Sequence, residues 1–117
     1  MNRKLDESIH PTSSVLDRIR YSVEQKAEVY AMLEAILDRL DELQRAPDPW
    51  EESCLVLALN FLDSGLYARA HKELIDCVLP PGDRPSWREQ QAINNSRGYS
   101  MVRLRMRLDG AKAANKQ

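Results

Sequence analysis

The sequence predicts an all-α protein, folded as a compact bundle of four or five helices. Gly occurs 4 times in 117 residues, aromatic residues make up 6% of the chain, and most of the commonest residue types favour helices. Apolar residues recur at helical spacing over residues 15–44, a segment without Gly or Pro. Breaks rich in Pro, Gly or Asn then divide the remainder into short segments. A chain of this length is expected to form one domain around one core.

We expect three parts along the chain. Residues 1–12 are polar, contain a Pro and are expected to form a flexible arm. Residues 13–108 are expected to form the single helical domain, and residues 109–117 a flexible tail. The hydrophobic fraction of 43% is sufficient for a core, and the 30% of charged residues indicates a well-solvated surface.

The first predicted helix is long and amphipathic, and it spans about residues 13–44. Its apolar stripe is formed by Leu16, Ile19, Val23, Tyr30, Leu33, Leu37 and Leu40. This spacing fits both ordinary helix packing, which we prefer, and a coiled coil. Since the helices that follow are shorter, part of the stripe is expected to stay uncovered, and a homodimer is a secondary expectation.

A helical hairpin is predicted next, over about residues 51–79. Its first helix, residues 51–64, is apolar on every side at its centre and is therefore expected to be the central core element. Gly65 is placed to end this helix in a left-handed conformation. The second helix runs from about Tyr67 to Leu79, where two Pro residues and a Gly follow.

Two C-terminal segments complete the predicted bundle. A short helix is expected over residues 87–93, followed by a break rich in Asn, Ser and Gly. Residues 99–108 fit two periods, because apolar residues alternate with arginines as in a strand, while Met101, Leu104 and Leu108 share a helical face. A lone strand would have no partner here, so we predict a helix.

The hairpin carries a pattern of small and large residues at its packing positions. With Gly65 at the turn, these positions are Leu57, Ala58, Phe61, Tyr67, Ala70, Leu74 and Pro81. Residues 51–81 thereby resemble one tetratricopeptide repeat, a helical hairpin of roughly 34 residues. The sequence departs from that family at its early Trp site, which is Cys54 or Leu55, and at its later Ala site, which is Cys77. In the family such hairpins hold peptides or helices, so the resemblance implies protein binding.

The two cysteines and two histidines do not form a recognisable metal motif. Cys54 and Cys77 are expected at the same end of the hairpin, which allows a disulfide, but two free buried thiols are preferred. With His10 and His71 they give neither CxxC nor HExxH spacing, so no metal and no cofactor are expected. No apolar run approaches the roughly 20 residues that span a bilayer, and no signal peptide is recognisable, so we expect a cytoplasmic protein without membrane contact.

Catalytic groups are not recognisable either. His71 has Glu73 and Asp76 as sequence neighbours, but these lie on another helical face, so His71 is interpreted as a surface residue. The chain has no Gly-rich phosphate loop. We therefore predict that the protein is not an enzyme and has no catalytic residues. An enzyme whose site is completed only in an oligomer remains an alternative.

Charge is distributed unevenly along the chain. Residues 1–80 carry 9 basic and 15 acidic side chains, whereas residues 81–117 carry 8 and 3. Three roles fit the C-terminal arginines: pairing within the fold or across a dimer, which is preferred, then binding of an acidic protein, then binding of nucleic acid. A sequence pI near 6.1 argues against the last of these.

These observations predict a non-enzymatic protein-binding module, such as a small adaptor, a chaperone-like protein or an inhibitor of a larger assembly. The alternative is a nucleic-acid-associated protein that uses the basic C-terminal segment. The expected partner is another protein. The candidate partner surface consists of Tyr30, Leu37, Leu40, Arg97, Arg103, Arg105 and Arg107.

Overall fold

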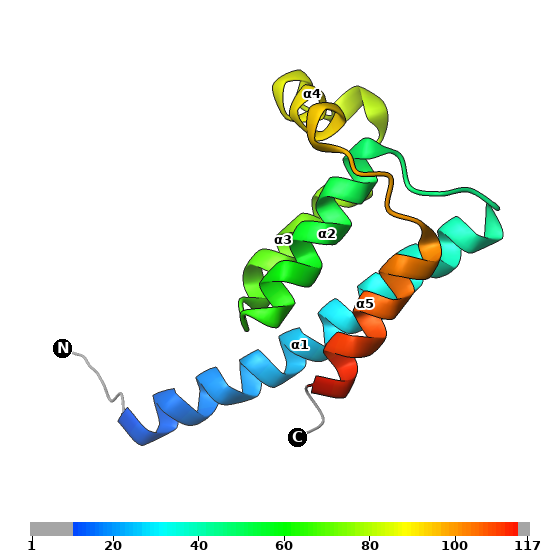
Figure 1. The fold of residues 1–117 in the computed structure, drawn as a ribbon. Coiled ribbons are helices and arrows are strands. Elements are labelled where there is room, and N and C mark those ends of the chain that lie inside the picture. The colour runs from blue at the N-terminus through cyan, green and yellow to red at the C-terminus, as the bar shows by residue number, and fades with distance from the viewer. Residues whose placement is uncertain (1–10, 115–117) are drawn as a thin grey trace.

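A computed structural model describes the backbone of residues 11–114 and the side chains of residues 24–114. Within that range the protein is all-helical and contains no strand (Figure 1). A 3-10 turn over Pro81–Asp83 separates the third and fourth helices. The five α-helices are α1 (Pro11–Glu42), α2 (Pro49–Asp63), α3 (Tyr67–Cys77), α4 (Ser86–Asn95) and α5 (Met101–Ala114). The predicted fold class, an all-α bundle, is confirmed.

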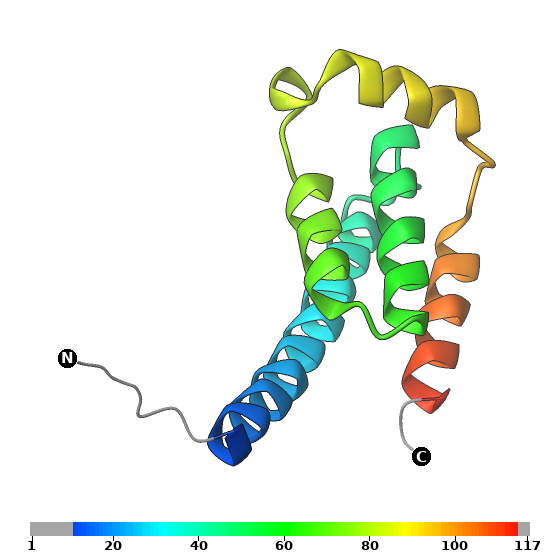
Figure 2. The same ribbon diagram turned by 90° about the vertical axis from the view of Figure 1, so that its left-hand side faces the viewer.

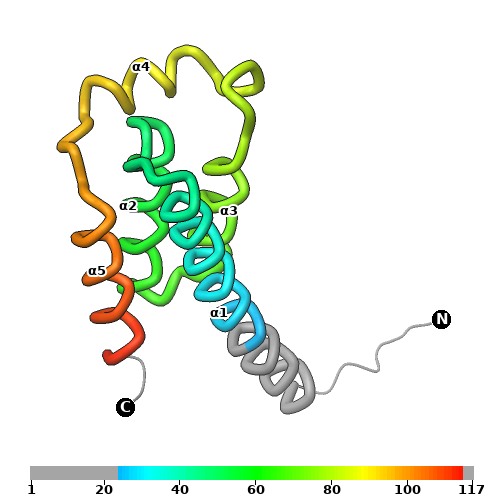
Figure 3. Tube along the Cα trace, turned by 90° about the vertical axis from the view of Figure 1, so that its right-hand side faces the viewer, coloured from blue at the N-terminus to red at the C-terminus, as the bar shows by residue number. Residues whose placement is uncertain are grey.

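The helices are arranged around α2, which packs against α3, α4 and α5. Figure 2 shows α3, α2 and α5 side by side, with α4 lying across one end of them. The long helix α1 packs against α3 and α5. Its C-terminal part, drawn in cyan, lies behind this layer in Figure 2 and in front of it in the opposite view of Figure 3. One face of the α3–α2–α5 layer is therefore covered by α1.

The core is apolar and is centred on α2, as the sequence predicts. Six apolar residues of this helix are at most 2% exposed: Trp50, Cys54, Leu55, Ala58, Leu59 and Leu62. They pack against buried side chains of the other helices, among them Val29, Leu33, Leu37, Leu40, Leu74, Leu104 and Leu108. Full burial of a Leu side chain stabilises a fold by about 1.5–3 kcal/mol, so this cluster supplies most of the stabilising free energy.

Both ends of α2 are fixed by local capping. At its start, the Glu51 N–H donates to Asp48 Oδ1 over 2.8 Å, while the Asp48 N–H donates to Glu51 Oε1 over 2.9 Å. This reciprocal box satisfies N–H groups that the helix leaves unpaired, and Pro49 loses nothing at the first helical position. At its end, Gly65 has φ +74° and the Leu66 N–H donates to the Phe61 carbonyl over 2.8 Å. The predicted left-handed cap at Gly65 is confirmed.

The C-terminal segment is helical and longer than the sequence predicts. Residues 101–108 form the first part of α5, which confirms the choice of helix over strand. The flexible tail predicted over residues 109–117 is wrong for residues 109–114, because α5 continues to Ala114. Its buried face adds Ala111, 5% exposed, which extends the apolar row of Leu104 and Leu108 by one turn. Residues 1–10 of the predicted arm lie outside the described residues.

Candidate functional site

Arg88 of α4 is held by several partners at one end of the helical hairpin. Its guanidinium donates to Asp76 over 2.8 Å and to Glu73 over 2.5 Å, both on α3. It also lies 3.7 Å from Cys54 Sγ and 4.8 Å from the centre of the Trp50 ring. Burial lowers the pKa of Arg88, but its carboxylate partners raise that pKa by more, so the guanidinium stays charged. These contacts attach α4 to the hairpin and are structural.

Trp50 lies between two arginines in the same cluster. Arg84 lies 5.5 Å from the Trp50 ring, pairs with Asp48 over 3.2 Å and donates through Nε to the Leu79 carbonyl over 3.1 Å. The Trp50 indole N–H donates to the Asp76 carbonyl over 2.8 Å, so this buried side chain has its polar atom satisfied. The charged groups of this cluster are therefore paired with one another within the fold.

Glu52 fixes the connection between α4 and α5. The side chain is in the core, 6% exposed, and its carboxylate accepts three hydrogen bonds. The donors are Ser96 Oγ at 3.2 Å, the Arg97 N–H at 2.8 Å and the Tyr99 N–H at 3.1 Å. A carboxylate taken out of water requires such donors. Glu52 was not singled out from the sequence, although a second carboxylate beside the helix cap, shortly before the apolar centre of the helix, was a signal.

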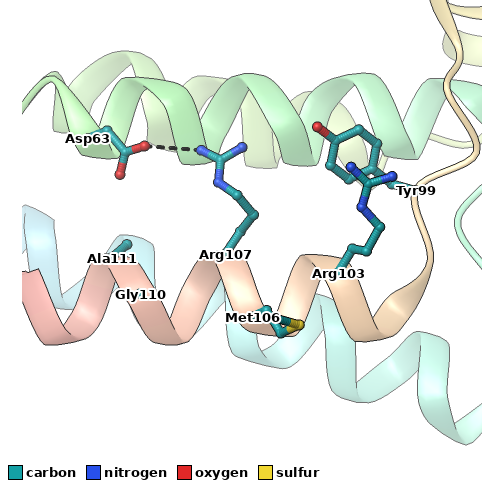
Figure 4. A pocket seen from close by; sticks show the side chains of 7 residues that line it. All are labelled: Asp63, Tyr99, Arg103, Met106, Arg107, Gly110 and Ala111. Carbon is teal, nitrogen blue, oxygen red and sulfur yellow. Dashed lines mark hydrogen bonds and ion pairs between the residues drawn. The ribbon is translucent and has the colours of Figure 1, made fainter.

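A groove of about 430 Å³ lies between α2 and α5 (Figure 4). We call it the α2–α5 groove, and it is lined by Asp63, Tyr99, Arg103, Met106, Arg107, Gly110 and Ala111. A second depression of about 380 Å³ runs along α2 toward α4 and shares Tyr99 with the first. Its lining includes Leu57 and Arg97. Tyr99, whose backbone is positioned by Glu52, therefore stands between the two concave surfaces.

The two arginines of α5 in this groove have different partners. Both extend from α5 toward α2 in Figure 4, where Arg107 reaches Asp63 and Arg103 lies over Tyr99. Arg107 is 3.0 Å from the Asp63 carboxylate, whereas the Arg103 guanidinium is 4.5 Å from the centre of the Tyr99 ring. Within the described part of the chain, no carboxylate pairs with the side chain of Arg103 or Arg97. Two positive charges beside the groove are thus uncompensated.

Exposed apolar side chains follow the same helix. Val102 is 68% exposed and Met106 is 67% exposed. They are four residues apart, so they are neighbours on the surface of α5. The core face of α5 already consists of Leu104, Leu108 and Ala111. Val102 and Met106 therefore lie on a second face of α5 and have no role in the core.

The structure brings together only part of the predicted partner surface. Arg97, Arg103 and Arg107 lie at or beside the α2–α5 groove. Leu37 and Leu40 are 1% and 2% exposed, so the prediction that they face a partner is wrong. The reason is that α3 and α5 cover the stripe of α1 at these positions.

Tyr30 and Arg105 have contacts within the fold. The half-buried Tyr30 donates its hydroxyl to the Ala111 carbonyl over 3.3 Å, which connects α1 to α5. Arg105 lies 2.6 Å from Asp38 and 2.7 Å from Asp41, both on α1. Hydrogen bonds with these two carboxylates raise the pKa of Arg105. Pairing within the fold, the preferred role of the C-terminal arginines, is therefore observed for Arg105 and Arg107.

The cysteines and His71 have structural environments. Cys54 and Cys77 are free and buried, as preferred from the sequence. A hydrogen bond with Cys54, together with burial, raises the pKa of the Cys77 thiol, which makes it a poor nucleophile. His71 Nε2 lies 3.8 Å from Glu28 Oε2 of α1 and its side chain is 27% exposed, so it is less exposed than a surface interpretation implies. In the described residues, no three potential ligands gather as a metal site would require.

A further groove of about 400 Å³ lies between α1 and α3. Leu43 and Val78, which are 46% and 63% exposed, line it. Its two cations are compensated, since Arg39 pairs with Glu42 over 3.3 Å and Arg45 with Glu51 over 2.7 Å. This α1–α3 groove is apolar like the first one but offers no unpaired charge.

Comparisons with protein-family models, curated proteins and solved structures give no match to this chain. None of the helices over residues 11–114 combines the length and the apolar character needed to cross a membrane.

Proposed function

We propose that this protein is a non-enzymatic binding module that holds a segment of another protein in the α2–α5 groove. The observation that carries the proposal is the exposure of Val102 and Met106 beside Arg103, whose charge has no carboxylate partner within the described residues. In the isolated chain, these apolar side chains stay exposed to water and the charge of Arg103 has no ion-pair partner among the described residues. A partner segment could cover the apolar side chains and pair with this charge.

The resemblance of the α2–α3 hairpin to a tetratricopeptide repeat supports the same proposal by analogy. Hairpins of that family serve as scaffolds for protein contacts, although a fold alone does not fix a function. In this chain α5 lies beside α2, and the groove is lined mainly by α5, with Asp63 as the lining residue from the hairpin. An adaptor, a chaperone-like protein or an inhibitor of a larger assembly would each use such a surface.

Nucleic-acid binding is less well supported by the geometry. A phosphate backbone is bound through a row of cations. Two of the four arginines from 97 to 107, Arg105 and Arg107, are already paired with carboxylates of α1 and α2. The remaining two stand beside apolar side chains, an arrangement that is more typical of a protein interface.

A pair of matched variants tests the proposal. Val102→Asp places a charge on the α5 surface, and Val78→Asp makes the same change on the α1–α3 groove at a similar exposure, 68% against 63%. Both variants and the original chain are used to capture proteins from a cell extract, and the captured proteins are quantified by mass spectrometry. We expect Val102→Asp to lose partners that Val78→Asp retains. Equal capture by all three proteins, or loss only with Val78→Asp, would contradict the proposal.

A further inference from the structure

The charges beside the α2–α5 groove indicate which protein segments fit it, and this inference rests on the proposed function. Asp63 contributes the one negative charge of the groove lining, and Arg107 neutralises it over 3.0 Å. The positive charge of Arg103 then remains in excess in this lining, and the side chain of Arg97, in the adjoining depression, likewise has no paired carboxylate within the described chain. We infer that the groove binds an acidic amphipathic segment of a partner protein, with carboxylates at these two arginines and an apolar side chain over Met106.

The cationic side of the groove is already ordered. Stacking on Tyr99 restricts the guanidinium of Arg103, and hydrogen bonds to the buried Glu52 hold the backbone N–H groups of Arg97 and Tyr99. Less side-chain entropy is therefore lost at Arg103 when a carboxylate arrives. Stacking leaves the N–H donors at the edge of a guanidinium free for bidentate pairing, the geometry in which Arg binds carboxylates best.

Gly110 leaves room for a partner segment to approach α5 closely. It lies in the interior of α5, where Gly is less favourable than Ala, and it lines the groove. A Cβ atom at this position would meet no atom within 4 Å, so packing inside the fold does not require Gly. A bound segment that packs closely against α5 would require it, because small residues let two helices approach.

The apolar part of the groove suits a variety of anchors. Met106 is flexible and polarizable, so its side chain adapts to Leu, Ile, Met or Phe of the partner. Val102 lies one turn away and extends the apolar contact along α5. A row of phosphates would leave both side chains uncovered, which favours a protein segment over an oligonucleotide.

Selection from a random dodecapeptide library displayed on phage tests this inference. The library is selected on the intact chain, and enriched peptides are then measured for binding to Arg97→Glu/Arg103→Glu. The matched control is Arg39→Glu/Lys72→Glu, which reverses two cations whose side chains are 68% and 76% exposed on α1 and α3. We expect enriched peptides to combine an excess of Asp and Glu with Leu, Met or Phe. Their affinity should fall about tenfold in the groove variant and little in the control.

Each outcome decides a different part of the inference. Peptides that depend on Val102 but show no acidic excess would overturn the acidic chemistry and leave the proposed function standing. Peptides that bind to Val102→Asp and to Arg97→Glu/Arg103→Glu as tightly as to the original chain would overturn both. A labelled single-stranded oligonucleotide serves as a second probe. If it binds at low salt through Arg97 and Arg103 while no acidic peptide does, the partner class is wrong. Should the double variant not fold, the composition of the peptides selected on the intact chain still decides the question.

Discussion

Two arginines of this protein lie over aromatic rings in nearly the same way, and yet their surroundings differ. Arg88 is 4.8 Å from the centre of the Trp50 ring and Arg103 is 4.5 Å from the centre of the Tyr99 ring. Arg88 has Glu73 and Asp76 as ion-pair partners, with side chains that are 15% and 19% exposed. Arg103 is exposed, and no ion pair of the described residues includes it.

The difference shows that an aromatic contact alone does not make an arginine structural. The carboxylate partners decide whether its charge is paired within the fold or is accessible to a partner. At the α4 end of the hairpin, the guanidinium of Arg88 is paired with two carboxylates of α3, and these ion pairs hold α4 against α3. At the α2–α5 groove, the same stacking orders Arg103 while its charge stays accessible. Removal of either side chain therefore measures a different property, folding stability in one case and binding in the other.

The largest effect is expected for Arg88→Ala. The substitution leaves the half-buried carboxylates of Glu73 and Asp76 without their main cation, and removal of one member of such a cluster costs about 3 kcal/mol. Urea denaturation measures this as a fall in the free energy of unfolding. Arg103→Ala is the matched control and should change that free energy by about 0.5 kcal/mol or less. Equal losses for the two variants would remove the distinction between the two arginines.

The second effect concerns Glu52→Gln. An amide has one acceptor oxygen where the carboxylate has two, so at least one of the donors from Ser96, Arg97 and Tyr99 loses its partner. We expect a loss of about 2 kcal/mol in the free energy of unfolding. Hydrogen exchange at the amides of Arg97 and Tyr99 should become faster than at the amides of α2. Unchanged exchange at these two amides would show that Glu52 does not position the groove.

A smaller effect is expected at alkaline pH through Cys77. Since its pKa is raised in the folded protein above the ordinary 9.0, the thiol contributes stability below pH 9.0 that is lost as the unfolded chain begins to release the proton. The free energy of unfolding should fall by about 1 kcal/mol for this thiol between pH 9.0 and pH 10. Urea denaturation at these pH values is compared for the original chain and Cys77→Ala. An identical pH slope in the two proteins would contradict this account of Cys77.

The smallest effect on stability is expected for Gly110→Ala, and its sign is favourable. Ala is the better helix former and its Cβ meets no neighbour, so the free energy of unfolding should rise by about 0.5 kcal/mol. Peptides selected on the groove should nevertheless bind more weakly, because the added methyl group lies where a bound backbone would pack. Ala68→Gly, at an exposed position of α3, is a control for helix propensity alone. Tighter or unchanged peptide binding to Gly110→Ala would argue against close approach at this position.

Much of the fold was predictable because its signals are local. The apolar centre of α2, the left-handed Gly65 and the Pro residues after α3 each act within a few residues of the chain. The end of α5 was missed because the charged residues after Leu108 resemble a tail, while Ala111 is buried only through its contact with the rest of the bundle. Local propensity carries no information on such a contact.

The candidate site was less predictable, because it depends on which helices meet. Leu37 and Leu40 belong to an apolar stripe that the sequence identifies, but the sequence does not say that α3 and α5 cover it. Arg103 and Arg107 are four residues apart and face α2, whereas Arg105 lies on another side of the helix and faces α1. The helical period therefore determines which arginines of α5 face α2 and which one faces α1.

Exposed Val102 and Met106 were not singled out from the sequence, although a signal was present. A helix with one buried face needs one apolar row, and α5 carries apolar residues on two sides. Because apolar residues alternate with arginines in this segment, the second row resembles a strand pattern in the sequence.

Amide NMR spectra of the intact chain, titrated with the most enriched acidic peptide, show residue by residue where the peptide binds. We expect the shifts to concentrate on residues 97–110 and on the exposed face of α2 around Leu57 and Asp63, while signals around Leu43 and Val78 of the α1–α3 groove stay in place. Shifts confined to the α1–α3 groove, or spread evenly over all five helices, would contradict the assignment of the α2–α5 groove as the binding site.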